Sequence, residues 1–65
     1  MTSSSIAAVG YDPATNVLEI EFKEGGVYQY FAVPHSTHAA LMAAERKGAF
    51  VNSTIKPRHR FVEVY

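Results

Sequence analysis

The side chains with the clearest chemical potential are five basic residues late in the chain. They are Arg46, Lys47, Lys56, Arg58 and Arg60, with Phe50 and Phe61 interleaved among them. Lysine and arginine attract phosphate through the release of counterions, and exposed aromatic rings stack on unpaired bases. Basic helix ends and solvated tails also serve solubility alone, and a formal net charge of zero is unusual for a nucleic-acid binder. The residues leave both interpretations open.

Other groups of reactive type lack partners at a useful spacing. His35, His38 and His59 would supply three zinc ligands, but no carboxylate or thiolate is spaced to complete the site. Glu19 and Glu21 share a strand face about 7 Å apart, yet an open strand face offers no cleft for glycoside hydrolysis. We therefore predict no catalytic residue, no metal ion and no cofactor. We also predict no small-molecule substrate, because so small a chain has little volume for a cleft of ~300 Å³.

The length of 65 residues predicts one domain, placed at 1–65 with a flexible lead-in at 1–4. A domain of this size buries only about 60% of the surface that its unfolded chain exposes, so its stability is marginal. The chain has no cysteine, which leaves good packing or homodimer formation as sources of stability. No run approaches the ~18 apolar residues of a membrane span and no signal peptide is evident, so we expect a cytoplasmic protein without membrane contact.

Residues that favour β-structure form three runs, separated by a proline-containing turn and a glycine-rich turn. The predicted strands are residues 5–11, 17–23 and 27–33. The middle strand alternates cleanly, with Leu18, Ile20 and Phe22 on one face and charged residues on the other. Because the intervening turns are short, we expect the three strands to pair as an antiparallel meander.

The glycine-rich turn decides which face Tyr28 and Tyr30 occupy. A two-residue loop at Glu24-Gly25 sends both tyrosines to the charged face, whereas a three-residue loop sends them to the apolar face beside Ile20. We favour the three-residue loop, because glycine fits a type I turn followed by a bulge, while a two-residue turn prefers Asn or Asp to glutamate. Both rings then join the core with their hydroxyl groups at its rim.

Helix-forming residues follow Pro34 and extend over 35–47, with Gly48 as the predicted stop. Residues 49–56 predict one short helix, and residues 60–65 alternate as either an edge strand or a tail. The predicted fold is α+β: a three-stranded antiparallel β-meander with one main α-helix packed on it, then a short helical turn and a short C-terminal edge strand. The predicted core comprises Ile20, Phe22, Tyr28, Tyr30, Leu41, Phe50 and Ile55.

An ordered series of short motifs resembles a known family. The motifs are Gly10-Tyr11-Asp12, Tyr28-Gln29-Tyr30, Val33-Pro34 and Lys47-Gly48 followed by Phe50 and Asn52. In this order they resemble the KTSC domain, a small module at the C-terminus of some lysyl-tRNA synthetases that also occurs as a free-standing protein. Its hallmark is the central Tyr-x-Tyr, and the resemblance covers nearly the whole chain. The family has no established activity, and its synthetase setting implies RNA binding.

We therefore predict a small non-catalytic binding module for RNA or for a protein that handles nucleic acid. Basic side chains would attract phosphate and aromatic rings would supply contact area. The predicted contact residues are Arg46, Lys47, Lys56, Arg58, Arg60, Tyr28 and Tyr30. The alternative is a protein interaction or regulatory module that docks on a larger enzyme of translation or transcription, or on a second copy, through an edge strand.

Overall fold

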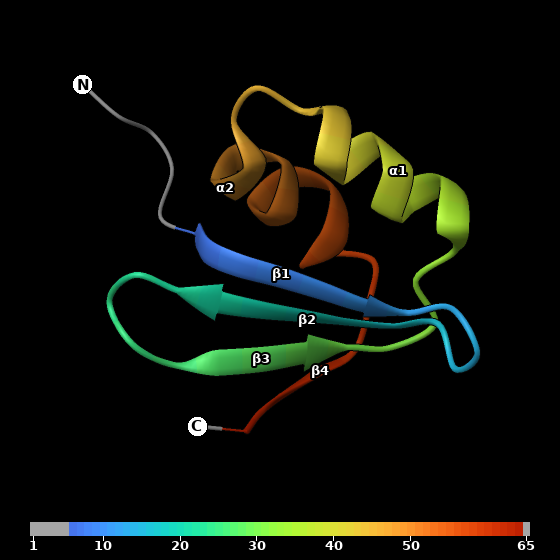
Figure 1. Ribbon diagram of the computed structural model, residues 1–65, viewed down its shortest axis with the longest axis horizontal. Coiled ribbons are helices and arrows are strands. Elements are labelled where there is room, and N and C mark those ends of the chain that lie inside the picture. The colour runs from blue at the N-terminus through green and yellow to red at the C-terminus, as the bar shows by residue number, and fades with distance from the viewer. Residues whose placement is uncertain (1–5, 65) are drawn as a thin grey trace.

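The computed structural model describes residues 6–64, which form a four-stranded antiparallel sheet covered on one face by helices (Figure 1). The strands are β1 (Ile6–Asp12), β2 (Val17–Phe22), β3 (Val27–Tyr30) and β4 (Phe61–Glu63). The helical segments are α1 (His35–Ala43), α2 (Lys47–Phe50) and the π-helix η1 (Val51–Ile55). The lead-in predicted at 1–4 lies outside the described residues.

The predicted α+β class and the meander of β1, β2 and β3 are confirmed, since the strands lie in chain order across the sheet. The C-terminal alternation, which left an edge strand and a tail as alternatives, forms strand β4. It pairs with β3 through Gln29 opposite Val62 and Tyr30 opposite Phe61. The amide of Val64 donates to the carbonyl of Val27 at 2.7 Å, which prolongs the pairing. Of the two alternatives, the edge strand is therefore the one that forms, and it extends the three-stranded meander to a four-stranded sheet.

The turn between β2 and β3 is the three-residue loop that we favoured. The amide of Gly25 donates to the carbonyl of Phe22 at 3.0 Å, and the amide of Phe22 donates to the carbonyl of Gly26 at 3.1 Å. Gly25 has φ of 100°, a conformation that suits glycine because it has no Cβ. The register that follows places Tyr28 opposite Ile20. Both tyrosines thus lie on the helix-covered face, as predicted.

The helical part differs from the prediction at its centre. Helix α1 ends at Ala43, four residues before the predicted end at position 47, because Ala44 takes an extended conformation with ψ of 139°. Gly48 is not a stop: it is buried inside α2. The short helix predicted at 49–56 is divided between α2 and η1, in which the amide of Lys56 donates to the carbonyl of Val51 at 2.8 Å. None of the helices in residues 6–64 has the length and hydrophobicity to cross a membrane.

The core lies between the sheet and the helices. Its fully buried side chains include Leu18 and Ile20 from β2 and Leu41 from α1. Of the predicted core residues, Ile20, Tyr30, Leu41 and Ile55 are completely buried, whereas Phe22, Tyr28 and Phe50 are partly buried and pack against the core from its rim. The core also contains four residues that the predicted core did not include, which are Ile6, Leu18, Val33 and Val51.

Truncation of Ile20 should test this core. We expect Ile20→Ala to lower the free energy of unfolding by about 2–5 kcal/mol, because it leaves a cavity under the helices. The total stability of a chain of this length is only about 3–10 kcal/mol. Urea denaturation followed by circular dichroism measures the change. The neighbouring Glu21→Ala, on the exposed face, should change stability by less than about 0.5 kcal/mol, and an equal loss in the two variants would contradict the assignment of faces.

The glycine bulge provides a second test. Gly25→Ala should destabilise the fold by about 1–2 kcal/mol, because an L-residue is strained at positive φ even though its Cβ would meet nothing within 4 Å. Gly10→Ala is the matched control: its Cβ also meets nothing within 4 Å, but Gly10 has no positive φ. Thermal denaturation of both variants distinguishes strain from loss of space. A larger loss at position 10 would show that the backbone of the turn is not the constraint.

Candidate functional site

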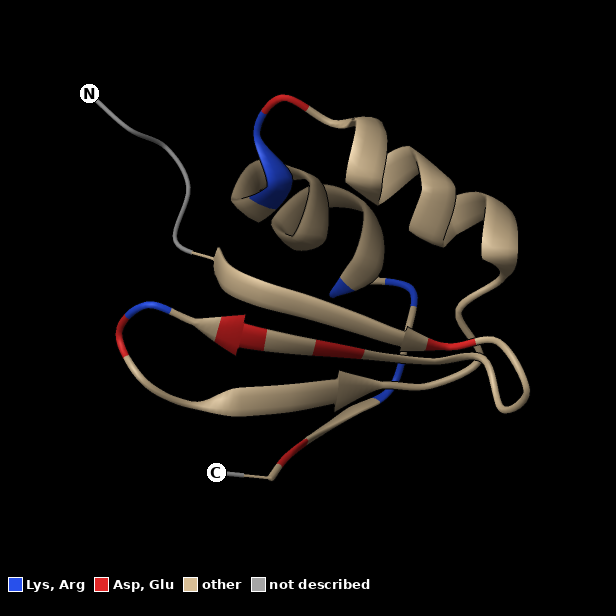
Figure 2. Ribbon diagram, in the orientation of Figure 1, with Lys and Arg blue, Asp and Glu red and all other residues tan. Residues whose placement is uncertain are grey.

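The basic residues predicted to bind nucleic acid fall into two groups (Figure 2). Arg46 and Lys47 lie at the junction between α1 and α2, where Lys47 Nζ donates to the carbonyl of Ala44 at 3.2 Å. The second group follows η1 on the connection to β4, which we call the basic connection. It contains Lys56, Arg58 and Arg60. The structure therefore brings three of the five basic residues into one segment and places the other two apart from it.

Backbone hydrogen bonds fix the course of the basic connection. The amides of Arg58 and His59 both donate to the carbonyl of Ile55, at 3.1 and 3.0 Å. His59 Nδ1 lies 3.1 Å from the carbonyl oxygen of Phe31, whose amide donates to the carbonyl of Arg60 at 2.9 Å. Because the backbone is held in this way, the exposed side chains of Arg58 and Arg60 are presented from a defined track beside β3.

The face of the sheet that points away from the helices carries two glutamates of β2. Glu19 and Glu21 project from β2 on the side away from the helices, and Gln29 Nε2 donates to Glu19 Oε1 at 3.0 Å. A hollow of about 410 Å³ on this face is lined in part by Asp12 and Glu19. Carboxylates repel phosphate, so this face does not suit a polyanion. Glu19 and Glu21 thus lie on β2 inside the sheet, whereas the basic connection runs into β4 at the edge of the sheet.

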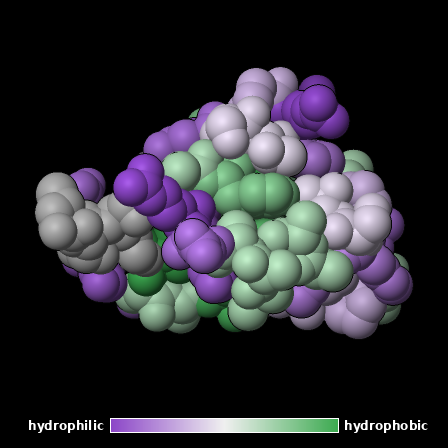
Figure 3. Space-filling view, turned by 90° about the horizontal axis from the view of Figure 1, so that it is seen from above, coloured by the Kyte–Doolittle hydropathy of each residue, from purple (hydrophilic) through white to green (hydrophobic). Residues whose placement is uncertain are grey.

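The outer face of the helical layer is mainly apolar. Figure 3 looks down on this layer and shows hydrophobic residues in its middle, with hydrophilic residues at its edge. Met42 is 48% exposed there, and Ala39, Ala40 and Ala43 of α1 are also exposed. This face offers apolar surface rather than charge, so it differs in character from the basic connection.

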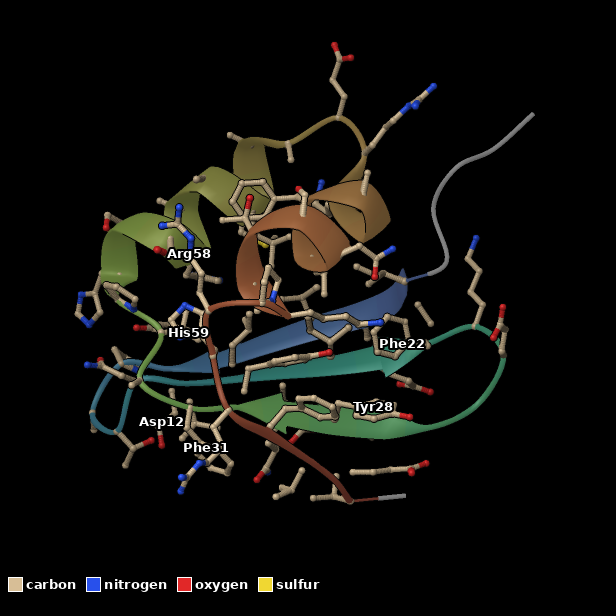
Figure 4. The ribbon with its side chains drawn as sticks, turned by 180° about the vertical axis from the view of Figure 1, so that it is seen from behind. Asp12, Phe22, Tyr28, Phe31, Arg58 and His59 are labelled. Atoms are coloured by element: carbon tan, nitrogen blue, oxygen red, sulfur yellow. The ribbon has the colours of Figure 1, made fainter. Side chains whose placement is uncertain are left out.

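Four aromatic rings from three neighbouring strands form a continuous cluster, which we call the aromatic cluster. The rings are Phe22, Tyr28, Tyr30 and Phe61. Phe22 meets Tyr28 edge-on at a centroid distance of 5.5 Å, and Phe61 lies 5.7 Å from Tyr28 and 5.5 Å from Tyr30. The register of β2, β3 and β4 produces the cluster, because alternation directs these residues to the same face. Figure 4 shows Phe22 and Tyr28 side by side at the end of the sheet near the β2–β3 turn.

A hollow of about 410 Å³ opens between the aromatic cluster and η1. All four rings line it on the sheet side, Asn52 and Lys56 line it on the helix side, and Glu24 and Gly25 lie at the end formed by the β2–β3 turn. The expectation that the chain is too small for a cleft of this size is therefore wrong. The hollow exists because the helices cover only part of the sheet face, which leaves Phe22 and Tyr28 partly exposed. We call it the aromatic hollow.

Lys56 links the aromatic hollow to the basic connection. Its ammonium nitrogen lies 5.8 Å from the centroid of the Phe22 ring, within the range of a cation–π contact. Lys56 is also the first residue of the basic connection, so its ammonium group belongs both to the basic connection and to the wall of the aromatic hollow. The structure thus unites Tyr28, Tyr30 and Lys56 of the predicted contact residues in a single hollow.

The hydroxyl group of Tyr30 is buried and, among the described residues, has no hydrogen-bond partner. The whole side chain is 0% exposed, yet Tyr30 lines the aromatic hollow. Removal from water, and secondarily the neighbouring Tyr28, raise the pKa of Tyr30 above the ordinary value for tyrosine. A buried hydroxyl without a partner is costly, which makes this atom exceptional in the core.

The three histidines considered for zinc have other contacts. His38 stacks on Tyr11 at 4.4 Å with an interplanar angle of 10°, and His35 meets the same ring edge-on at 5.6 Å. The Tyr11 hydroxyl donates to the carbonyl of Val33 at 2.6 Å, which ties β1 to the start of α1. Within residues 6–64 no three potential metal ligands come together. This cluster holds elements of the fold together.

Comparison with known proteins relates this geometry to a family. The model of the KTSC domain family matches residues 2–61. The chain belongs to the KTSC domain family. The resemblance identified from the ordered motifs is thus confirmed.

One solved structure and two relatives illustrate what this chain is similar to. The crystal structure of a KTSC domain protein from Yersinia pestis is 40% identical, has a TM-score of 0.91, and is matched over 100% of this chain and 92% of that one. A protein of Tsukamurella paurometabola is 48% identical over 60 residues, which is 92% of this chain and 90% of the relative. A lysine–tRNA ligase of Nostoc punctiforme is 39% identical over 61 residues, which is 94% of this chain but 11% of the ligase.

Four side chains of the aromatic hollow were not among the predicted contact residues of this KTSC domain. Glu24 was considered only as a residue of the β2–β3 turn. Phe22 was assigned to the core, Phe61 was noted only as a ring among basic residues, and Asn52 appeared only in the family motif. The signal for Phe61 was present in its alternation with Val62, but its place opposite Tyr30 depends on the pairing of β3 with β4. Asn52 carries no such signal, because the π-helix that positions it was not predicted.

The pKa of Tyr30 leads to a prediction for alkaline pH. A raised pKa in the folded state means that the native protein keeps a proton that the unfolded chain releases, so the free energy of unfolding should fall as pH rises above about 10. In Tyr30→Phe this fall should be smaller, although Tyr11, whose pKa is also raised by burial, continues to contribute. Urea denaturation of both proteins at neutral and alkaline pH measures the difference. An identical pH dependence would show that Tyr30 is not perturbed.

Proposed function

We propose that this KTSC domain is a non-catalytic module that binds single-stranded RNA. The observation that carries the proposal is the position of Lys56, which lines the aromatic hollow and begins the basic connection. In a single-stranded nucleic acid, negatively charged phosphates alternate with unpaired bases. The phosphates bind cations, and the bases stack on flat aromatic surfaces. A track of cations beside a group of aromatic rings suits both.

The distribution of charge favours the basic connection as the segment that contacts RNA. Arg58 and Arg60 are exposed on the same segment as Lys56, while Glu19 and Glu21 lie on the other face of the sheet. An RNA strand approaching the domain would therefore be attracted to the basic connection and repelled by the two glutamates of β2. With three cations, the attraction is modest and depends on salt.

The relatives give independent support. The segment of the Nostoc punctiforme protein that resembles this domain belongs to a lysine–tRNA ligase, an enzyme named for an RNA. Similar sequences thus occur both within a lysine–tRNA ligase and as a protein of nearly the length of this domain. This distribution is consistent with a domain that binds RNA by itself. The proposal transfers only the type of ligand and not the activity of the ligase.

Fluorescence anisotropy with a labelled single-stranded RNA tests the proposal. Affinity should fall with rising salt, and each phosphate contact should contribute about 0.7 to the slope of log affinity against log salt. Arg58→Ala combined with Arg60→Ala should reduce this slope by about 1.4 and weaken binding at low salt. Arg46→Ala with Lys47→Ala removes the same charge at the junction between α1 and α2 and should have a smaller effect.

Equal effects of the two double variants would indicate attraction by net charge alone and would contradict a role for the basic connection. Absence of any binding at low salt would discard the RNA proposal. NMR spectra of labelled protein recorded in the same titration locate the contact surface on the folded domain.

A second candidate function is the docking of a protein partner on β4. Phe61, Val62 and Val64 are 46%, 45% and 41% exposed, and β4 is an edge strand. Exposed apolar side chains on a sheet edge favour strand addition by another chain, including a second copy. Binding of this kind buries apolar surface and tolerates salt, so shifts in β4 that persist at high salt would favour it over RNA.

A further inference from the structure

We infer that the aromatic hollow is a pocket for one unpaired nucleobase, with the Tyr30 hydroxyl as its internal hydrogen-bonding group and Lys56 as the contact of the attached phosphate. The inference rests on the proposed function and adds to it a site at which a base is held. It starts from two independent observations. One is the four-ring wall of the hollow, and the other is the buried hydroxyl of Tyr30, which has no partner among the residues that the structure describes.

The walls of the hollow suit a flat ring. Phe22, Tyr28 and Phe61 are partly or largely exposed, so they present ring surface to a ligand rather than only to one another. The volume of about 410 Å³ lies in the range of small-ligand sites. Stacking on aromatic side chains is the common mode by which proteins hold an unpaired base, because every base has a π-face.

Other ligand classes fit the hollow less well. A cation such as a lysine side chain of a partner would be attracted by Glu24 at the β2–β3 turn, but Lys56, which lies over the Phe22 ring, would repel it from the aromatic wall. A purely aliphatic group would leave the Tyr30 hydroxyl unsatisfied in the core. A small inorganic anion would leave the aromatic walls without contact. A nucleotide combines a flat surface, a polar edge and a negative charge, and so uses all three features.

The polar groups of the hollow match the edge of a base. A tyrosine hydroxyl donates one hydrogen bond and accepts others, and the amide of Asn52 contains both a donor and an acceptor. Glu24, at the β2–β3 turn, adds a carboxylate that accepts only. Base edges carry amino donors and carbonyl or ring-nitrogen acceptors. A hydrogen bond from the base to Tyr30 would relieve the one buried side-chain atom without a partner among the described residues.

With a base in the hollow, the attached phosphate would lie beside Lys56. Lys56 lies on the helix side of the hollow, and the chain continues from it to Arg58 and Arg60. In Figure 4, Phe22 and Tyr28 lie toward one end of the sheet and Arg58 toward the other, so the basic connection leads away from the hollow. A base in the hollow therefore leaves its neighbouring phosphates along this track.

The experiment compares two RNA strands of equal length and charge, one fully abasic and one with a single base at its centre. We expect the strand with the base to bind about 10-fold more tightly, as one stacked base does. In Tyr30→Phe, affinity for this strand should fall about 2- to 10-fold, while affinity for the abasic strand stays unchanged. The variant keeps the ring and so keeps the fold, which circular dichroism verifies.

Equal binding of the two strands by the natural protein would overturn the base pocket and leave salt-dependent RNA binding intact. Binding of neither strand would remove the proposed function. A titration with a free nucleoside monophosphate distinguishes the source of the base: shifts of the Tyr28, Tyr30 and Phe61 rings at comparable affinity would support the pocket and contradict the need for a strand. Ring shifts that are the same for both strands would count against the hollow as the site.

Discussion

The three-residue turn between β2 and β3 is the constraint on which the structure depends. Gly25 adopts a positive φ there, and the bulge that it forms sets Tyr28 opposite Ile20 and Tyr30 opposite Leu18. A shift of one residue would move both rings to the face of the glutamates, because successive side chains point to opposite faces. It would empty part of the core and remove two walls of the aromatic hollow. Fold and site therefore share one determinant.

The aromatic hollow reflects a compromise between burial and exposure. A small domain needs its large rings in the core, yet the helices of residues 6–64 cover only part of the sheet, so the rings near the β2–β3 turn stay at the rim. Tyr30 illustrates the result, since its ring is buried while its hydroxyl has no hydrogen-bond partner within residues 6–64. A protein selected for stability alone would favour phenylalanine at such a position. The hydroxyl therefore gives the proposed base pocket its one buried polar group without a partner among residues 6–64.

The strands could be predicted because their signals are local. Alternation at Leu18, Ile20 and Phe22 and the glycine-rich turn fixed the sheet and its register. The end of α1 could not be predicted, because residues 44–47 retain helix-forming composition and the break depends on packing of the following helix against the core. The aromatic hollow could be predicted only in part. Tyr28, Tyr30 and Lys56 were selected as contact residues, but their proximity depends on the positions of η1 and β4, which follow from tertiary contacts.

Strand β4 also sets the order in which the hollow assembles. The hairpins β1–β2 and β2–β3 join neighbours in the sequence, whereas β4 must return across the whole helical segment to reach β3. Contacts between distant residues incur a larger loop-closure entropy and tend to form later in folding. With three residues at the edge of the sheet, β4 is also the strand with the least to hold it. Local opening of β4 would move Phe61 away from the hollow without unfolding the meander. A ligand that binds the hollow only when β4 is paired would therefore increase the protection of the C-terminal amides from hydrogen exchange.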